Sequence, residues 1–264
     1  MIRTLLENLV YSKRLSAEHG LSVYIEVDDM RILFDTGATD AFLHNAQEMK
    51  IDLGAVTHCI ISHGHYDHTG GLPAFRRQNA QAKIMLHQSA LNGRFKRNGE
   101  YIGMPEAAKQ SIGDSYISSD EWLQIGKNVF LMPAAAIVYP DDTHTKGFSM
   151  EIDDKLHDDP FSDEQSLVIL REGHMNIISG CSHRGITNII QAAIDRFQLP
   201  IDLVLGGFHL IHEKDISTIA ERLNSFSIRR IGVCHCTGIE QYAQLRHTLT
   251  AEVFYNHTGK KVAI

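Results

Sequence analysis

The stretch Cys59-Ile60-Ile61-Ser62-His63-Gly64-His65-Tyr66-Asp67-His68 decides the fold and the chemistry of this 264-residue chain. A short apolar run predicts a strand that stops before the first histidine, and three histidines and an aspartate follow at once. Imidazole nitrogens and carboxylate oxygens are ligands that zinc, iron and manganese accept. In an extended segment His63 and His65 point to one side, while Asp67 and His68 face the other. This pattern favours two adjacent metal ions over one; the alternative is a histidine-rich surface loop.

Composition limits the classes of protein that remain. The length suffices for one large domain with a substantial core, and 43% hydrophobic and 22% charged residues are ordinary for a globular protein. A net charge of −7 without a long Lys/Arg cluster argues against a nucleic-acid partner. There is no apolar run of about 18 residues, which argues against a membrane span. Residues 1–10 lack the apolar core of a signal peptide. We expect a cytoplasmic protein with a small-molecule substrate, and its oligomeric state stays open.

Strand-like and helix-like patterns alternate along the chain. Apolar and β-branched runs predict strands, and apolar residues at three- and four-residue spacing predict helices. The predicted strands are Leu21–Val27, Arg31–Phe34, His58–Ile61, Lys83–Leu86, Val129–Leu131, Ser166–Leu170, Asn176–Ile178, Leu203–Leu205 and Arg230–Val233, and the predicted helices are Ala41–Met49, Gly185–Phe197 and Ile216–Phe226. This order predicts an α/β (α+β) fold with two sheets that helices cover on the outside.

The segment from Leu91 to Gln165 interrupts this pattern, because it is rich in Gly, Asp and Ser and has only short apolar runs. It is either a solvated excursion or a lid that carries substrate contacts. Arg94, Lys96 and Arg97 form a small basic cluster within it. This cluster is a candidate phosphate site; an exposed turn is the alternative.

Further ligand-type residues follow later predicted strands. His183 follows the strand that ends near Ile178, His235 follows the strand that ends at Val233, and His209 follows Gly206-Gly207. Like the first motif, each of these histidines lies in the loop that follows a strand, so His183 and His235 are candidate ligands. His209 has two open roles, as a ligand or as a pocket residue that donates or accepts a proton.

The four cysteines are too few for a disulfide framework in a chain of this size. Cys59 lies within an apolar run and is expected to be buried. Cys234 and Cys236 flank His235, and on an extended segment their side chains would pack on the face opposite to it. Cys181 stands directly after a glycine at a strand end, where it could ligate a metal as a thiolate or pack beneath the site.

His-x-His-x-Asp-His after a strand resembles the signature of the metallo-β-lactamase superfamily. Further segments extend the resemblance to Gly238 and to the branch that includes the archaeal dihydropterin–ribofuranosylaminobenzene phosphate synthases. These segments are Glu18-His19-Gly20-Leu21-Ser22, Leu33-Phe34-Asp35-Thr36-Gly37, Ser179-Gly180-Cys181-Ser182-His183, Gly206-Gly207-Phe208-His209-Leu210 and His235-Cys236-Thr237-Gly238. The resemblance implies an αββα sandwich of two mixed sheets, a single domain over residues 1–264, and an excursion at about 91–165 that could cover the active site.

The resemblance also implies two divalent metal ions, with Zn²⁺ expected first and Fe or Mn as alternatives. One ion would take His63, His65 and His183, and the other would take Asp67, His68 and His235. Asp35 either orients a ligand histidine or stabilises a turn.

The chain departs from the wider superfamily at two places. Cys181 stands where a bridging aspartate is usual. No histidine occupies the usual third-motif position, near which Asp163 and Glu164 lie. His144-Thr145-Lys146-Gly147 matches the His-Thr-x-Gly pattern that is common at that position. It lies 22 residues before Ser166, which is too far from the predicted strand for the usual third motif.

These features predict a metal-dependent hydrolase that uses a metal-activated water on a small phosphorylated or pterin-like substrate. Asp67 and His209 are the candidate catalytic residues, and Arg184, Arg94 and Arg97 are the candidate substrate contacts. Arg184 could equally cap the following helix region. Two alternatives are open: a transferase that joins a dihydropterin methyl diphosphate to an aminobenzene ribofuranosyl phosphate and releases diphosphate, and a metal-binding sensor without turnover.

Overall fold

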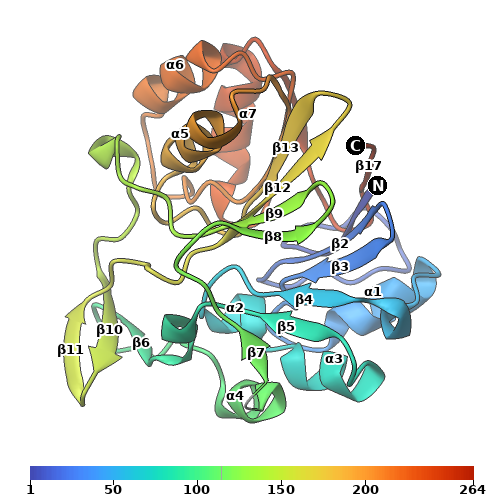
Figure 1. The fold of residues 1–264 in the computed structure, drawn as a ribbon. Helices are drawn as coiled ribbons and strands as arrows, with labels where there is room; N and C mark the ends of the chain where they lie inside the picture. The colour runs from blue at the N-terminus through green and yellow to red at the C-terminus, as the bar shows by residue number, and fades with distance from the viewer. Residues whose placement is uncertain (114) are drawn as a thin grey trace. The chain divides into compact units, whose positions relative to one another are not determined.

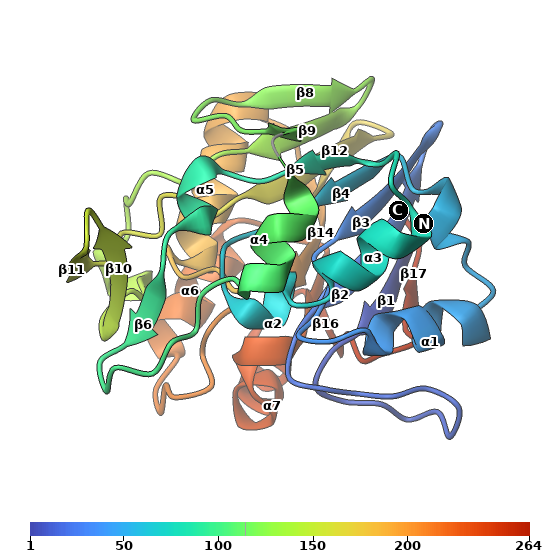
Figure 2. The ribbon, with the colours of Figure 1, turned by 90° about the horizontal axis from the view of Figure 1, so that it is seen from below.

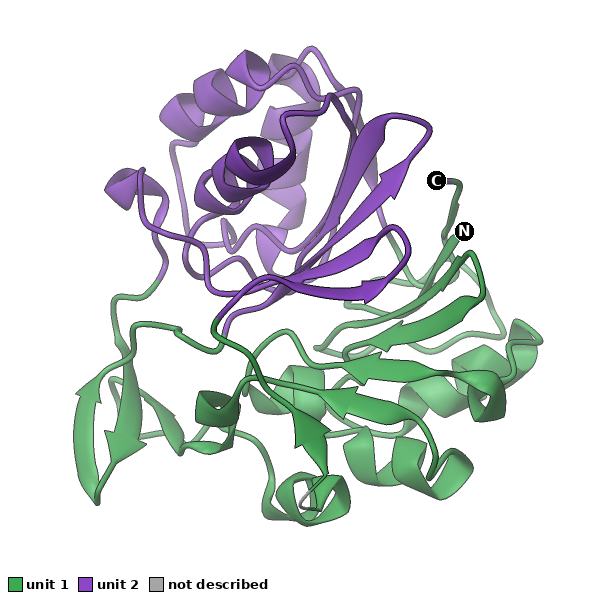
Figure 3. Ribbon diagram, viewed as in Figure 1, with its two compact units in different colours: residues 1–120, 145–163, 257–263 green, residues 121–144, 164–256, 264 purple. Residues whose placement is uncertain are grey.

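The computed structural model describes residues 1–113 and 115–264, and the chain divides into two compact units (Figure 3). Unit 1 comprises residues 1–120, 145–163 and 257–263. Unit 2 comprises residues 121–144, 164–256 and 264. That the whole chain acts as one domain stays a prediction.

Unit 1 is built on a seven-stranded mixed sheet in the order β17-β1-β2-β3-β4-β5-β7. Its strands are β1 (Ile2–Leu6), β2 (Ser22–Val27), β3 (Met30–Phe34), β4 (His58–Ile60), β5 (Lys83–Met85), β7 (Tyr116–Ile117) and β17 (Lys261–Val262). β17, β1, β2 and β3 pair antiparallel, whereas β3, β4, β5 and β7 run parallel. The carboxyl ends of β3 and β4 therefore meet at the same edge of this sheet.

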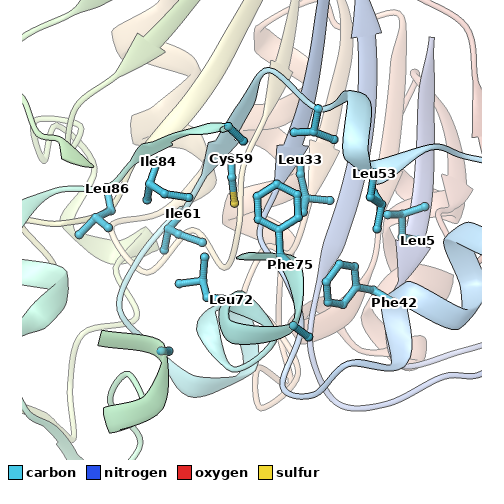
Figure 4. Close-up of a cluster of buried hydrophobic side chains, with 14 of the residues drawn as sticks. Leu5, Leu33, Phe42, Leu53, Cys59, Ile61, Leu72, Phe75, Ile84 and Leu86 are labelled. Atoms are coloured by element: carbon cyan, nitrogen blue, oxygen red, sulfur yellow. The ribbon is translucent and has the colours of Figure 1, made fainter. Parts of the chain in front are cut away.

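Helices α1 (Ala41–Glu48), α3 (Leu72–Gln78) and α4 (Glu106–Ile112) supply side chains to the core of unit 1, and Figure 2 shows them beside its strands. Phe42 of α1 and Phe75 of α3 are fully buried against Leu33 and Cys59 of the strands (Figure 4). The predicted burial of Cys59 is confirmed, and this burial raises the pKa of its thiol. The core fixes α3 and with it the chain that precedes it, which carries the histidine motif.

The excursion from residue 91 to 165 contains more regular structure than the sequence predicted. In unit 1 it holds α4, β7 and a small antiparallel sheet of β6 (Arg94–Lys96), β10 (Phe148–Ile152) and β11 (Lys155–Asp158). In unit 2 it supplies β8 (Leu123–Gly126), β9 (Val129–Met132) and the 3₁₀ turn η3 (Pro140–Asp142). Asp153 and Asp154, both with positive φ, form the tight turn between β10 and β11. Apart from β9, which is mostly buried and which the sequence predicted, these strands are short and partly exposed, so their hydrophobic periodicity is weak.

Unit 2 is built on a second seven-stranded mixed sheet, in the order β16-β15-β14-β13-β12-β9-β8. Its further strands are β12 (Ser166–Arg171), β13 (His174–Ile178), β14 (Ile201–Gly206), β15 (Arg230–Val233) and β16 (Glu252–Tyr255). β13 to β16 are parallel, and β8, β9, β12 and β13 pair antiparallel. Three helices lie beside this sheet (Figure 1): α5 (Ile186–Phe197), α6 (Ser217–Ser225) and α7 (Ile239–Thr248). The carboxyl ends of β13, β14 and β15 share one edge.

The predicted fold class, two mixed sheets with helices, is confirmed. Every predicted strand and helix is present, with ends that differ from the predicted ones by two residues at most. The sequence analysis missed the strands β1, β16 and β17 near the termini, and the helices α3, α4 and α7. Among the described residues, no helix is both long and apolar enough to cross a membrane.

Candidate metal centre

The histidine motif of unit 1 leaves strand β4 and turns into a one-turn helix. α2 (Tyr66–Thr69) begins directly after His65, whose backbone is still extended. The expectation of an extended segment is therefore correct up to His65 and wrong beyond it. Asp67 and His68 lie on this helical turn, and the helix changes their direction relative to His63. All four side chains are buried, with exposures of 0–6%.

Asp35 fastens the motif to the end of β3. Its carboxylate accepts hydrogen bonds from the backbone N–H of Ser62 at 2.7 Å and from the Ser62 hydroxyl at 2.7 Å, and lies 2.7 Å from His68 Nδ1. Asp35 is fully buried and has a positive φ of 60°, a conformation that costs free energy in a non-glycine residue. Asp35 thus contacts a candidate ligand histidine and also stabilises the turn, so both predicted roles find a contact in the structure. With Nδ1 beside Asp35, Nε2 is the ring nitrogen of His68 that would serve as the donor atom if a metal binds here.

His63 and His65 present ring nitrogens to one another. His63 Nε2 lies 3.0 Å from His65 Nδ1, and the Ser62 hydroxyl lies 2.9 Å from His63 Nδ1. Burial, with smaller contributions from His68 and His65, lowers the pKa of His63 well below its ordinary value. The ring is therefore neutral, which is the form that ligates metals. Two nitrogens on a tetrahedral zinc ion lie about 3.3 Å apart, so the donor set fits a divalent metal.

Asp67 lies beside a histidine that the sequence analysis did not select. His19 Nε2 is 3.2 Å from Asp67 Oδ2, and His68 Nε2 is 3.9 Å from the same oxygen. The side chain of His19 is 59% exposed. Its place in the segment Glu18-His19-Gly20 was visible in the sequence, but no spacing rule connects it to a motif nearly 50 residues later. The structure therefore adds His19 to the polar residues around Asp67.

The candidate phosphate contact Arg94 has a different environment from the one expected. Its guanidinium is only 1% exposed, with Nε 2.9 Å from Asp159 and Nη2 2.7 Å from Asp163. The other carboxylate oxygen of Asp163 accepts the backbone N–H of Gly64 at 2.7 Å. A Cβ on Gly64 would lie 2.3 Å from the carbonyl oxygen of Ala90 and 2.7 Å from Arg94 Nη1. Arg94 is thus part of a buried clamp on the turn between His63 and His65, and not of a surface basic cluster.

The remaining members of that cluster are at the surface. Lys96 forms an ion pair with Glu100 at 3.1 Å, and the side chain of Arg97 is exposed. A substrate contact by Arg97 stays a prediction.

In unit 2, Cys181, His209 and Cys236 come together at the ends of β13, β14 and β15. One ligand atom from each side chain lies within 4.8 Å of the other two. The sequence analysis had assigned Cys236 to packing on an extended segment. Residues His235–Thr237 instead form the 3₁₀ turn η4, so this orientation was wrong. Burial alone would raise the pKa of the Cys236 thiol, but hydrogen bonds with Cys181 and His209 and the nearby His235 hold it well below its ordinary value.

A buried carboxylate also organises the His183 loop in unit 2. Glu164 accepts the backbone N–H of His183 at 2.5 Å and that of Arg184 at 3.0 Å. The ring centroid of His183 lies 4.3 Å from that of His209. His144, the first residue of the segment His144-Thr145-Lys146-Gly147, donates its backbone N–H to the carbonyl of His183 at 2.7 Å. Asp163 and Glu164 therefore each hold a ligand loop through its backbone N–H groups.

Arg184 and His235 complete the predicted set in unit 2. Arg184 is half-buried, and its Nε donates to the carbonyl of Ala135 at 2.7 Å. His235 is 2% exposed and has a positive φ of 51°. Ligation by His183 and His235 and substrate binding by Arg184 stay predictions.

Comparison with known proteins identifies the family. The sequence model of the metallo-β-lactamase superfamily matches residues 15–155. The chain belongs to the metallo-β-lactamase superfamily. The structure is similar to the crystal structure of Tm1679, described as a metal-dependent hydrolase of the β-lactamase superfamily, with 32% identity, a TM-score of 0.88 and coverage of 100% of this chain and 98% of that one.

Two relatives come from Methanocaldococcus jannaschii. One is a 7,8-dihydropterin-6-methyl-4-(β-D-ribofuranosyl)-aminobenzene-5′-phosphate synthase, 28% identical over 98% of this chain and 95% of its own length. The other is an uncharacterized protein, 29% identical over the full length of both chains. The predicted resemblance to the superfamily and to the synthase branch is confirmed.

The Arg94–Asp163 clamp generates a prediction about stability. Asp163→Asn keeps the size of the side chain but places an amide opposite the guanidinium, which leaves part of a buried charge uncompensated. We expect the free energy of unfolding to fall by about 3–5 kcal/mol. Asp141→Asn is the matched control, because Asp141 pairs with Arg222 at 3.0 Å but is 48% exposed; its cost should be about 0–1 kcal/mol. Urea unfolding measures both, and equal small losses would show that the clamp carries no special stability.

Proposed function

We propose that this protein is a divalent-metal-dependent hydrolase whose substrate is a small phosphorylated or pterin-like molecule. The observation that carries the proposal is the donor set of unit 1. His63 is buried and neutral, its Nε2 lies 3.0 Å from His65 Nδ1, and His68 is held by Asp35 through Nδ1. Neutral imidazoles with one nitrogen oriented and the other available are the form in which histidine binds metals.

In this proposal the protein binds two divalent ions, for which Zn²⁺ is the first candidate. Six residues hold them: His63, His65, Asp67, His68, His183 and His235. Membership of the superfamily and the donor chemistry support metal binding, while the identity and number of the ions belong to the proposal. When bound, such ions acidify water and polarise phosphoryl oxygens. We place the protein in the cytoplasm, as its sequence suggests.

The chain's own residues orient the groups that react. Asp35 and the clamp of Asp163 and Arg94 hold the backbone of the histidine motif, so the donor atoms need little reorganisation. Asp67 and His209 are the proposed catalytic residues, with His209 as the group that holds or transfers a proton. Arg184, next to His183, is the proposed phosphate contact, because a guanidinium can grip phosphate with two parallel hydrogen bonds.

A second candidate function is a transferase, and the synthase from M. jannaschii favours it. In this reaction an arylamine-type acceptor would attack the methylene carbon of a dihydropterin methyl diphosphate. A new bond to that carbon would form, the carbon–oxygen bond to diphosphate would break, and a proton would leave the acceptor. The same donor set serves both candidates, because diphosphate departure and hydrolysis each place negative charge on phosphate oxygens.

Substitution of the ligands tests the metal-binding part of the proposal. His63→Ala and Asp67→Ala remove donor atoms from the same loop, so both should lose bound metal and metal-dependent turnover. His157→Ala is the control, because His157 lies on the exposed strand β11. Elemental analysis after chelation and reloading measures the stoichiometry. Wild-type metal content in both loop variants would refute this ligand set.

Diphosphate release separates the two candidate reactions. The protein is given a dihydropterin methyl diphosphate with and without the aminobenzene ribofuranosyl phosphate. A hydrolase should release diphosphate at a similar rate in both, with the hydroxymethyl pterin as product. A transferase should release it only with the acceptor, and mass spectrometry should show the coupled product. Faster metal-dependent turnover of uncharged lactones or thioesters, without inhibition by phosphate or diphosphate, would refute a phosphorylated substrate.

A further inference from the structure

The strap, residues 135–144 of unit 2, follows β9 and contacts the loop between β13 and α5. At its start the carbonyl of Ala135 accepts the Nε–H of Arg184 at 2.7 Å. In its middle the backbone N–H of Tyr139 donates to the side-chain oxygen of Asn188 at 2.7 Å, and the Asn188 amide donates back to the Tyr139 carbonyl at 3.1 Å. Because Asn188 is fully buried, these bonds hold the strap against the first turn of α5.

Gly185 is the N-cap of α5, and the strap lies too close to it for a side chain. Its φ is +95°, and a Cβ would lie 1.9 Å from the carbonyl oxygen of Asp142. Gly185 therefore has no side-chain oxygen that could accept the N–H groups of the first helical turn. The strap supplies that acceptor, because the Asp142 carboxylate accepts the backbone N–H of Thr187 at 2.8 Å and its hydroxyl at 2.6 Å. Asp142 thus anchors the strap to the start of α5.

Asp142 is fully buried, and its second carboxylate oxygen faces the end of the strap. This oxygen lies 3.4 Å from Nε2 of His144, whose side chain is 7% exposed. The backbone of His144 makes two contacts with His183. Its N–H donates to the His183 carbonyl at 2.7 Å, and its carbonyl oxygen lies 3.3 Å from His183 Nδ1. One buried carboxylate therefore links the start of α5 to the residue that contacts the His183 ring.

The contact at Nδ1 determines which nitrogen of His183 carries hydrogen. A carbonyl oxygen accepts hydrogen bonds and cannot donate them, so Nδ1 is the donor. Nδ1 carries hydrogen in this contact whether the ring is neutral or protonated, so the orientation does not depend on titration. In the neutral ring the lone pair is then on Nε2, which makes Nε2 the donor atom for a metal.

We propose that the strap is a positioning element, anchored by Asp142, that holds His183 in the Nδ1–H tautomer and leaves Nε2 as its donor atom. Asp142 and His144 are positioning residues in this proposal and supply no ligand atom. The carbonyl of Ala135 orients Arg184 in the same way, so the candidate ligand and the candidate phosphate contact share one support. The benefit for metal binding rests on the proposed function, whereas the tautomer itself does not.

NMR of the metal-free, ¹⁵N-labelled full chain tests the tautomer directly. Multiple-bond ¹H–¹⁵N correlations, recorded well above the ordinary imidazole pKa, distinguish the two ring nitrogens, and His183→Gln assigns the signals. Wild-type His183 should be in the Nδ1–H form, and Asp142→Ala should shift it toward the Nε2–H form. Asp142→Asn keeps an acceptor for the Thr187 N–H and should retain the wild-type tautomer. Asp141→Ala is the matched control, because Asp141 precedes Asp142 and pairs with Arg222 instead.

Cobalt binding measures the consequence for metal affinity and separates this inference from the proposed function. The d–d absorption of bound Co²⁺ reports its coordination. Loss of a contact that orients a ligand histidine weakens metal binding by about 10–100-fold, so Asp142→Ala should bind one Co²⁺ more weakly by this factor. Asp142→Asn and Asp141→Ala should bind Co²⁺ as the wild type does. A wild type that binds no Co²⁺ would contradict the proposed function, and the tautomer would still decide the role of the strap.

Three NMR results would overturn the inference. They are the Nε2–H form in the wild type, the same tautomer in the wild type and Asp142→Ala, and an equal shift in Asp141→Ala. Thermal unfolding adds a further check, because a lower Tm of Asp142→Ala with unchanged tautomer and Co²⁺ affinity would reduce Asp142 to a helix cap. Thr187→Val is a milder second variant that removes only the hydroxyl that Asp142 accepts. It should shift the tautomer in the same direction as Asp142→Ala.

Discussion

The buried carboxylate of Asp35 is the constraint on which the histidine motif depends. A charged group without solvent exposure is tolerated only when hydrogen-bond donors compensate for its lost hydration. Asp35 meets this requirement with the backbone and hydroxyl of Ser62 and the ring of His68, each at 2.7 Å. The same contacts join the end of β3 to the exit of β4 and orient a donor histidine. One carboxylate thus couples the stability of the sheet edge to the geometry of the candidate metal centre.

Buried carboxylates hold the ligand loops of both units in the same way. Asp163 accepts the N–H of Gly64 in unit 1, and Glu164, the next residue in the chain, accepts the N–H groups of His183 and Arg184 in unit 2. Neither acid needs to be a metal ligand to matter for the site. Both carboxylates act on the backbone of these loops. The loops of both candidate ligand sets are therefore fixed through their backbone, although the chain lacks a third-motif histidine.

The sequence predicted the fold and drew attention to the histidine motif because both depend on local patterns. Apolar runs marked the central strands, and ligand spacing marked His63, His65, Asp67 and His68. The rest depended on contacts between residues distant in sequence. Arg94 appeared to belong to a surface basic cluster because its neighbours Lys96 and Arg97 are basic, but Asp159 and Asp163, more than 60 residues later, bury it. Cys236 was assigned to packing because an extended segment was assumed. In the structure it lies near Cys181 and His209, because the parallel strands β13, β14 and β15 end side by side.

The central claim is that histidine and carboxylate side chains at the strand exits bind divalent metal. Anomalous diffraction from crystals of the zinc-loaded protein, recorded above and below the zinc absorption edge, tests it most directly. Strong anomalous density is expected within coordination distance of His63 Nε2, His65 Nδ1 and His68 Nε2. Zinc-loaded crystals without anomalous density at these nitrogens would contradict it.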